Sequence, residues 1–189
     1  GLDSTIDTYS FTFEGYGEYI IYNTDASTCS LPTESDNKVS LFIENPYVDI
    51  NNEGDLESAI CSDKDEIYIR ILNSLVLQPK KRSITKTVYL DLNNKTLSID
   101  NDPSQLNITY PESNVFYVDG GHLIINGEGE INGTNAGEYG YAITVDNGGQ
   151  VTIEKGTFKG DTTVIYVMKG TALLKGGYYE AKPYKSEYK

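Results

Sequence analysis

A repeated pattern in the C-terminal half is the feature that most constrains this fold. Each repeat has two short strands of alternating apolar residues joined by a glycine-containing turn, and a third short strand follows. The paired strands lie in residues 116–125, 143–153 and 165–174, and the third strands in residues 129–131, 156–158 and 177–179. Strands this short cannot bury a core within one repeat, so the repeats are expected to stack.

Stacking predicts ladders of inward apolar residues that run from coil to coil. The ladders are Phe116/Ile143/Ile165, Val118/Val145/Val167, Leu123/Val151/Ala172, Ile125/Ile153/Leu174 and Ile131/Phe158/Tyr179. An earlier copy over residues 90–99 would turn at Asn93 and Asn94, and the turn glycines and Asn147 suit corners with positive φ. The pattern predicts an all-β fold, a parallel β-helix, with a meander or sandwich of hairpins as the alternative.

A short helix is expected just before the repeats. Residues 55–62 have Asp55 as a suitable N-cap, and Leu56, Ala59 and Ile60 share one face. A stack of coils exposes unpaired strand edges and core side chains at its end. The helix is therefore expected to cap the N-terminal end of the β-helix.

The N-terminal part of the chain has a different composition. Residues 1–66 carry 15 of the 28 acidic residues and 2 of the 15 basic residues. Weak β patterns occur at residues 11–13, 19–22 and 39–43. The sequence therefore divides into an acidic β-rich segment over residues 1–50 and a β-helix over residues 51–189, whose coils begin at about residue 67.

Charge and length exclude several classes of partner. The net charge is -13, which argues against duplex nucleic acid or an anionic membrane surface. No apolar run approaches the roughly 20 residues of a membrane span. Cys29 and Cys61 are too few for a disulfide scaffold, and they are either two free thiols or a single disulfide.

Two patterns carry a resemblance to a known family: LDLNNKTL at residues 90–97 and GGQVTIEKGTFKG at residues 148–160. Residues 52–180 resemble the right-handed parallel β-helix modules of the pectate-lyase-like superfamily, and especially the non-catalytic modules of bacterial surface proteins. The resemblance implies a secreted or cell-surface bacterial protein with an adhesion, glycan-binding or spacer role, whose leader is not visible. The alternatives are an ancillary segment of a carbohydrate-active enzyme, such as a polysaccharide lyase or hydrolase, and a phage tail or spike segment.

The residues do not form a recognisable catalytic set. Pectate lyases use an arginine base and a calcium cluster, but the only arginines here, Arg70 and Arg82, precede the repeats. His122 is the only histidine and aligns with an exposed turn column. Glu128 and Glu130 are spaced for glycoside hydrolysis but are expected to be solvated. We therefore expect no enzyme activity, no catalytic residue and no cofactor.

Two groups of acidic residues are assigned to turns rather than to metal binding. Asp119 and Asp146 align in successive coils before the glycine turns, where their carboxylates are expected to accept bonds from nearby backbone amides. Residues 49–60 imitate the start of an EF-hand loop, but Ile60 stands where a bidentate Glu is needed. A helix-capping turn is expected there, and no metal site is expected.

Exposed tyrosines are the candidate binding residues. Tyr117, Thr144 and Tyr166 are expected to form an outward column on the first strand of each repeat, with Tyr139 and Tyr141 nearby. Tyrosine rings stack on sugars, and their hydroxyls form hydrogen bonds with sugar hydroxyls. The predicted ligand-binding residues are Tyr117, Tyr166, Tyr139 and Tyr141, and the predicted ligand is a glycan or another molecule of a host or cell surface.

The C-terminal end of the stack is expected to need a partner. After the last strand, residues 180–189 contain no apolar run that could cover core side chains such as Leu174. The expected solutions are further coils, a tail that folds back with Tyr184 and Tyr188, or end-to-end self-association, and further coils are preferred.

Within the coils, Val145 and Ile153 should point inward, while Thr144 and Thr152 should point outward. Val145→Asp should therefore unfold the module, and Thr144→Asp should be tolerated.

Overall fold

The computed structural model describes residues 15–23, 37–100, 114–134 and 140–182, and the chain forms two compact units, Gly1–Pro46 and Tyr47–Lys189. In the first unit, strands β1 (Gly17–Asn23) and β2 (Asn37–Ile43) pair antiparallel. The pattern noted at residues 11–13 lies outside the described residues, as do Tyr184 and Tyr188. Among the described residues, no helix is long and apolar enough to cross a membrane.

The second unit begins with one strand, one helix and two further strands. These are β3 (Tyr47–Ile50), α1 (Glu53–Ile60), β4 (Glu66–Ile71) and β5 (Leu75–Leu77). Residues 47–50 were expected in the N-terminal segment, but β3 pairs in parallel with β4, and Tyr47 and Ile50 lie opposite Tyr68 and Ile71. The ladder of the six-stranded sheet therefore begins at residue 47, before the helix.

Twelve further strands follow in four groups of three, each of which we call a coil. The coils are β6 (Ser83–Ile84), β7 (Thr87–Asp91), β8 (Lys95–Ile99); β9 (Phe116–Asp119), β10 (His122–Asn126), β11 (Gly129–Asn132); β12 (Ile143–Asp146), β13 (Gly149–Ile153), β14 (Thr157–Gly160); β15 (Ile165–Val167), β16 (Gly170–Leu174), β17 (Tyr178–Ala181).

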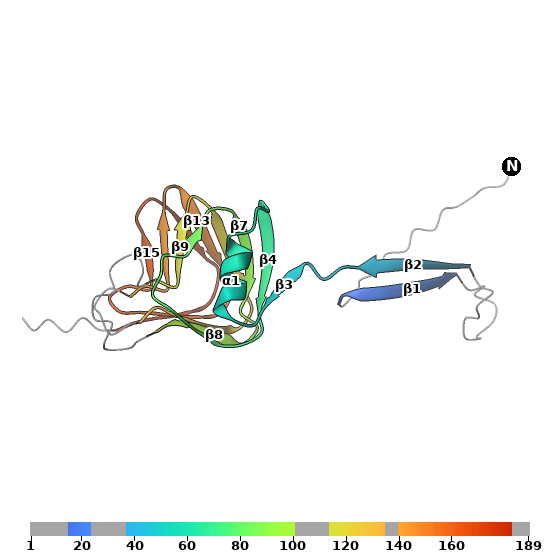
Figure 1. Ribbon diagram of the computed structural model, residues 1–189, viewed down its shortest axis with the longest axis horizontal. Coiled ribbons are helices and arrows are strands. Elements are labelled where there is room, and N and C mark those ends of the chain that lie inside the picture. Colours follow the sequence, from blue (N-terminus) through green and yellow to red (C-terminus); the bar gives the residue numbers. More distant parts are fainter. Residues whose placement is uncertain (1–14, 24–36, 101–113, 135–139, 183–189) are drawn as a thin grey trace, which may run out of the picture. The chain divides into compact units, whose positions relative to one another are not determined.

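Every third strand returns to the same sheet (Figure 1). The six-stranded sheet has the order β16-β13-β10-β7-β4-β3, the five-stranded sheet β17-β14-β11-β8-β5, and the four-stranded sheet β15-β12-β9-β6. All strand pairs described in this unit are parallel, so the alternative of a hairpin meander is wrong here. The architecture is mostly β with stacked parallel sheets and one short helix, and it is compatible with a parallel β-helix.

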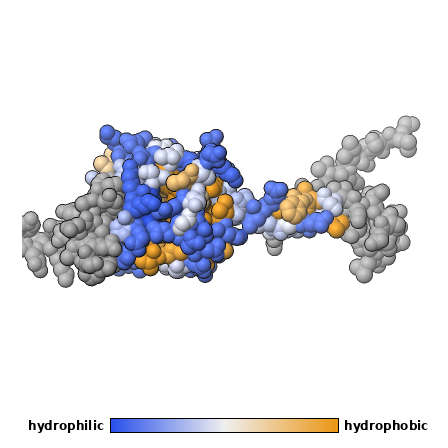
Figure 2. All heavy atoms as spheres, viewed as in Figure 1, coloured by the Kyte–Doolittle hydropathy of each residue, from blue (hydrophilic) through white to orange (hydrophobic). Residues whose placement is uncertain are grey.

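The predicted ladders are confirmed by the strand registers. Val145 lies opposite Val118 and Val167, and Phe158 lies opposite Ile131 and Tyr179. The other three ladders also pair as predicted. Inward side chains of the inner coils are almost completely buried, so the core runs as a column inside the coils. On the face drawn in Figure 2, the larger unit is mostly hydrophilic with a few hydrophobic areas.

The copy predicted over residues 90–99 exists, but its strands are not the ones expected. Residues Leu90 and Leu97 belong to β7 and β8, which pair with the second and third strands of the next coil, and β6 supplies the first strand. The turn at Asn93 and Asn94 is confirmed, because their φ angles are 47° and 58°.

The expected positive φ is confirmed at Gly120, Gly148 and Asn147, whose φ angles are 78°, 81° and 53°. The glycines that follow in the turns, Gly121, Gly149 and Gly170, are required for close packing instead. A Cβ on Gly121 would lie 2.6 Å from the Ile84 carbonyl oxygen, and one on Gly149 would lie 2.7 Å from the Val118 oxygen. A Cβ on Gly170 would likewise meet the Gly149 oxygen. At these corners the backbones of successive coils come too close for any side chain.

Helix α1 packs against β3, β4 and β5 at the N-terminal end of the stack, where it was expected (Figure 1). Leu56, Ala59 and Ile60 are buried as predicted. The N-cap, however, is Asn52 and not Asp55: the Asn52 Oδ1 accepts from the Asp55 amide at 3.0 Å, and Asp55 accepts from the Asn51 amide at 3.0 Å. This reciprocal capping starts the helix at Glu53, two residues earlier than expected.

Candidate ligand-binding face

The predicted tyrosine column is not an exposed surface. Tyr117 is 7% exposed and Tyr141 is 9% exposed, whereas Tyr166 is 39% exposed. The Tyr117 hydroxyl donates to Asp146 at 2.8 Å, and the Tyr141 and Tyr166 rings lie 5.1 Å apart. Tyr139 lies outside the described residues. The expected exposed column is therefore wrong, although the rings of Tyr141 and Tyr166 do lie together.

The outward side of the four-stranded sheet is partly buried. Thr144 is completely buried although it points away from the core, and Tyr117 on the same side is nearly so, whereas Tyr166 is exposed. Among the residues that the structure describes, the Thr144 hydroxyl has no hydrogen-bond partner. The expectation that Thr144→Asp is tolerated is therefore wrong, because a carboxylate at this position would be buried. Thr152, expected to be outward and exposed, is only 9% exposed.

An aromatic column does exist, on the outer side of the six-stranded sheet. Tyr47, Tyr68 and Tyr89 lie opposite one another on β3, β4 and β7. The Tyr68 and Tyr89 rings are stacked, with centroids 4.4 Å apart and planes 5° apart. Tyr47 meets Tyr68 edge-on at 5.9 Å. We call these three residues the tyrosine column; none of them was predicted as a binding residue.

A signal for the tyrosine column was present in the sequence. Its residues are spaced 21 positions apart along the chain, and the turn glycines Gly149 and Gly170 have the same spacing. Residues at the repeat period occupy the same position in successive coils, so three tyrosines at this period predict a stack. The copies predicted from the sequence begin at residue 90 and therefore do not include these three tyrosines.

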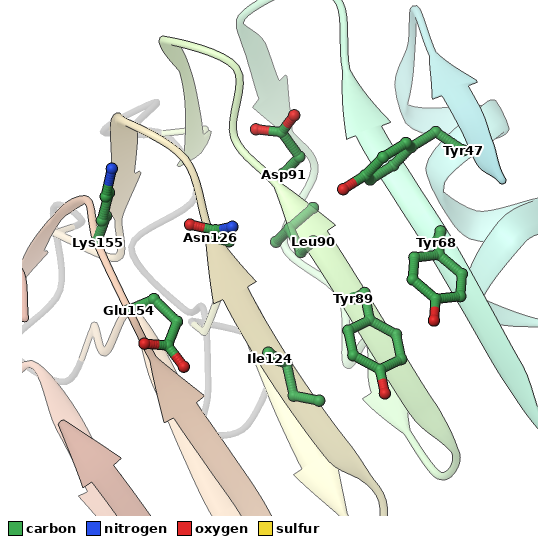
Figure 3. A pocket seen from close by; sticks show the side chains of 9 residues that line it. All are labelled: Tyr47, Tyr68, Tyr89, Leu90, Asp91, Ile124, Asn126, Glu154 and Lys155. Carbon is green, nitrogen blue, oxygen red and sulfur yellow. The ribbon is translucent and has the colours of Figure 1, made fainter. Parts of the chain in front are cut away.

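Beyond Tyr89, smaller side chains follow the tyrosine column on the same face of the sheet. The next positions on the same face are Ile124, Thr152 and Leu173. Tyr68 covers one face of the Tyr89 ring, and the other face is directed toward Ile124. The resulting hollow has a volume of about 390 Å³ (Figure 3). It is lined by Tyr47, Tyr68, Tyr89, Leu90, Asp91, Ile124, Asn126, Glu154 and Lys155.

Polar side chains border the hollow at the ends of the strands. Figure 3 shows Asp91, Asn126, Glu154 and Lys155 on one side of it, from neighbouring strands and the turns that follow them. Asp91 accepts a bond from the Asn93 amide at 2.9 Å, and Glu154 forms an ion pair with Lys175 at 2.7 Å. These contacts hold the carboxylates in place. The border offers both donors and acceptors.

Tyr68 remains protonated at neutral pH. The hydrogen bond to Glu66, together with desolvation, raises the pKa of Tyr68 to about 12. On the far side of the column, Arg70 forms an ion pair with Asp49 at 2.8 Å and lies 5.5 Å from the Tyr47 ring centroid. The hydroxyl of Tyr68 thus stays a hydrogen-bond donor, and Arg70 is bound to groups of the protein itself.

His122 lies on β10 and not in an exposed turn. It aligns with Gln150 as predicted, and its Nε2 lies 2.9 Å from the Thr152 hydroxyl oxygen. Burial lowers the pKa of His122 below its usual value of 6.5. Among the described residues, no carboxylate forms a hydrogen bond or ion pair with His122, so the geometry contains no triad through this residue.

The glutamates considered for hydrolysis are not a free pair. Glu130 forms an ion pair with Lys159 at 2.7 Å, and this bond raises the pKa of Lys159. Glu128 is exposed in the turn before β11. A carboxylate held by a lysine at this distance is a structural group, so this pair offers no catalytic geometry.

Asp119 and Asp146 lie opposite each other as predicted, but side chains rather than backbone amides are their partners. Asn147 donates to Asp119 at 2.6 Å and Lys81 does so at 3.1 Å; together they hold the pKa of Asp119 below its usual 3.8. The residues of the EF-hand-like stretch form the capping turn of α1. Among the described residues, no group of three or more His, Cys, Asp or Glu side chains could hold a metal ion.

Of the two cysteines, Cys61 is a free and exposed thiol at the end of α1. Cys29 lies outside the described residues. Comparisons with protein-family models, with curated proteins and with solved structures find no match for this chain.

Proposed function

We propose that this chain is a non-catalytic, right-handed parallel β-helix module of the pectate-lyase-like type, from a secreted or cell-surface bacterial protein, and that it binds a glycan. One observation carries the binding proposal: the hollow beside Tyr89 combines an aromatic wall, an aliphatic floor at Ile124 and a polar border. Sugar sites need an apolar surface for the C–H face of the ring and polar groups for its hydroxyls.

The outer part of the Tyr89 ring, beyond the reach of the shorter Ile124 side chain, is the proposed stacking surface. Asp91 and Glu154 would accept bonds from sugar hydroxyls, and Asn126 and Lys155 would donate to them. Glu154 is already paired with Lys175, so the charges of Asp91, Glu154 and Lys155 at the border are balanced. A border without net positive charge offers a uronate no attraction over a neutral sugar. The proposed ligand is a neutral glycan, and this preference differs from the polyuronates that pectate lyases cleave.

An enzymatic role is the second candidate, and the positions of Asp91 and Glu154 favour testing it. They lie two strands apart, on either side of Asn126, which places their backbones roughly 9.5 Å apart. Inverting glycosidases separate their carboxyl groups by about 6.5–9.5 Å. Against this role, Glu154 is bound to Lys175 and Asp91 to a turn amide. Binding without hydrolysis is therefore the proposal.

The test is binding to a panel of neutral and uronate oligosaccharides, measured by calorimetry on the full chain. Tyr89→Ala should weaken binding of the best ligand about tenfold, because a lost aromatic stacking contact costs about 1.5 kcal/mol. Tyr89→Phe should bind nearly as the wild type does, because the ring remains. Tyr16→Ala is the matched control: this tyrosine is 49% exposed but belongs to the other unit.

Three results would contradict the proposal. Equal affinity of Tyr89→Ala and the wild type would place the site elsewhere. No binding to any glycan would leave a spacer role for the module. Release of reducing ends, abolished by Glu154→Gln, would replace binding by hydrolysis.

A further inference from the structure

The last coil exposes side chains that every inner coil buries. Val167 is 41% exposed and Leu174 is 49% exposed. Their ladder neighbours Val145 and Ile153 are completely buried. In the same coil, Tyr179 of the third strand is only partly buried. The column of core side chains therefore reaches the surface at this end on all three sheets.

The same end presents unpaired backbone groups. Strands β15, β16 and β17 are each the last strand of their sheet among the strands described. The Lys175 amide donates to the Ile153 oxygen, which directs the peptide groups of alternate residues in β16 toward β13. Ala172 and Leu174, which alternate with these residues, therefore direct their N–H and C=O groups away from β13, toward the open end of the stack. Inward side chains and free peptide groups thus belong to the same residues.

The opposite end of the stack is closed. Helix α1 covers it, with Leu56, Ala59 and Ile60 buried against the first strands. Arg82, 3% exposed, is bound to Glu53 of this helix and to the Gln78 carbonyl oxygen at 2.8 Å. A second copy could therefore not stack head to tail without displacing the helix.

We infer that the β15–β16–β17 end is a self-association surface that joins two copies of this chain end to end. One open end per stack limits the assembly to a closed dimer. A two-fold axis through the middle of β16, perpendicular to the stack, pairs β16 with the partner's β16. The same axis exchanges the other two sheets, so β15 pairs with the partner's β17. All three open edges are then satisfied at once, with antiparallel pairing.

The charges at this end permit contact between like copies. Lys175 is bound to Glu154 at 2.7 Å and Lys182 to Asp161 at 3.0 Å, so two of its lysines are compensated within their own chain. Ala172, at the centre of β16, is small enough to let two strands meet at the axis. The net charge of -13 comes from residues 1–66, and residues 67–189 carry equal numbers of acidic and basic residues, so copies that meet at this end repel each other little.

The test is the molar mass of the full chain in solution, measured by light scattering over a range of concentrations and salt. Leu174→Lys places a charge on the inward side and should weaken dimerisation at least tenfold. Leu173→Lys is the matched control: Leu173 is 50% exposed on the same strand but points outward, so this variant should remain a dimer. Ala172→Pro removes an outward N–H without breaking a bond to β13 and should also dissociate the dimer.

Several outcomes would overturn the inference. The first is a wild type that stays monomeric at high concentration and high salt. The second is an equal loss of dimer in Leu173→Lys and Leu174→Lys. Growth into longer oligomers would show that both ends are open. A monomer destabilised by Leu174→Lys would show that another segment of its own chain covers the end.

Discussion

Two buried threonines on consecutive strands differ in one hydrogen bond. Within the part of the chain that the structure describes, the Thr144 hydroxyl has no hydrogen-bond partner, whereas the Thr152 hydroxyl oxygen lies 2.9 Å from His122 Nε2. An unsatisfied buried hydroxyl costs roughly 1–3 kcal/mol. Thr144→Val should therefore raise the free energy of unfolding by about 1 kcal/mol, and Thr152→Val should lower it. Urea denaturation of both variants measures the difference, and a stabilising Thr152→Val would contradict the pairing.

The single histidine makes stability depend on pH in a defined direction. Burial lowers the pKa of His122, so the unfolded chain takes up this proton as the pH falls through about 6.5, and the folded protein does so only at lower pH. The neutral imidazole therefore contributes its full stability above about pH 6.5. This stability is lost as the pH falls from there through the lower pKa of His122 in the folded protein.

The comparison of His122→Gln with the wild type isolates this effect from the carboxylates. As the pH falls from 7.5 to 5, the free energy of unfolding should fall less in His122→Gln than in the wild type. An NMR titration of the histidine checks the premise directly. A folded pKa at or above 6.5 would contradict it.

Helix α1 depends on one short polar side chain. Asn52→Ala removes the Oδ1 that accepts from the Asp55 amide and should cost about 1 kcal/mol of stability. Asn51→Ala is the control, because its backbone amide, and not its side chain, bonds to Asp55. Thermal unfolding compares the two variants. Equal losses would show that the cap does not hold the helix.

At the level of strands, the sequence predicts pairing well because inward positions must be apolar in every coil. The alignment of Phe158 with Ile131 and Tyr179 followed from this constraint alone. Exposure could not be predicted in the same way. Alternation shows which way Thr144 points from its own sheet but not whether the outer side is covered. Outward tyrosines therefore differ in exposure even within one sheet, since Tyr117 is buried and Tyr166 is exposed.

The helix boundary shows a second limit of the sequence. Asp55 and Asn52 are both good capping residues, and the choice between them depends on which backbone amides remain unpaired. The sequence does not predict β3 because this strand has only four residues, which directly follow the last residue of the first unit and end shortly before α1. Its alternation is too short to be distinguished from a weak β pattern.

For the whole molecule, the two units predict different contributions to stability. The β1–β2 hairpin has only two strands, and Ile20, Leu41 and Phe42 are exposed on it. Two-stranded hairpins are marginally stable alone. A fragment of residues 47–189 should therefore unfold cooperatively at the temperature of the full chain, as measured by circular dichroism. A fragment of residues 66–189, which lacks β3 and α1, should aggregate instead.

The closed and open ends also give the synthesis of this protein a direction. A nascent chain leaves the ribosome from its N-terminus, so α1 is available before the coils that follow it. Each new coil then needs only the edge of the coil made just before it, and never one still to be translated. Parallel pairing is slow when distant segments must find each other, but here each partner is already in place. Helix α1, which covers one end of the finished stack, is therefore also the surface on which the first coils of the nascent chain can pack.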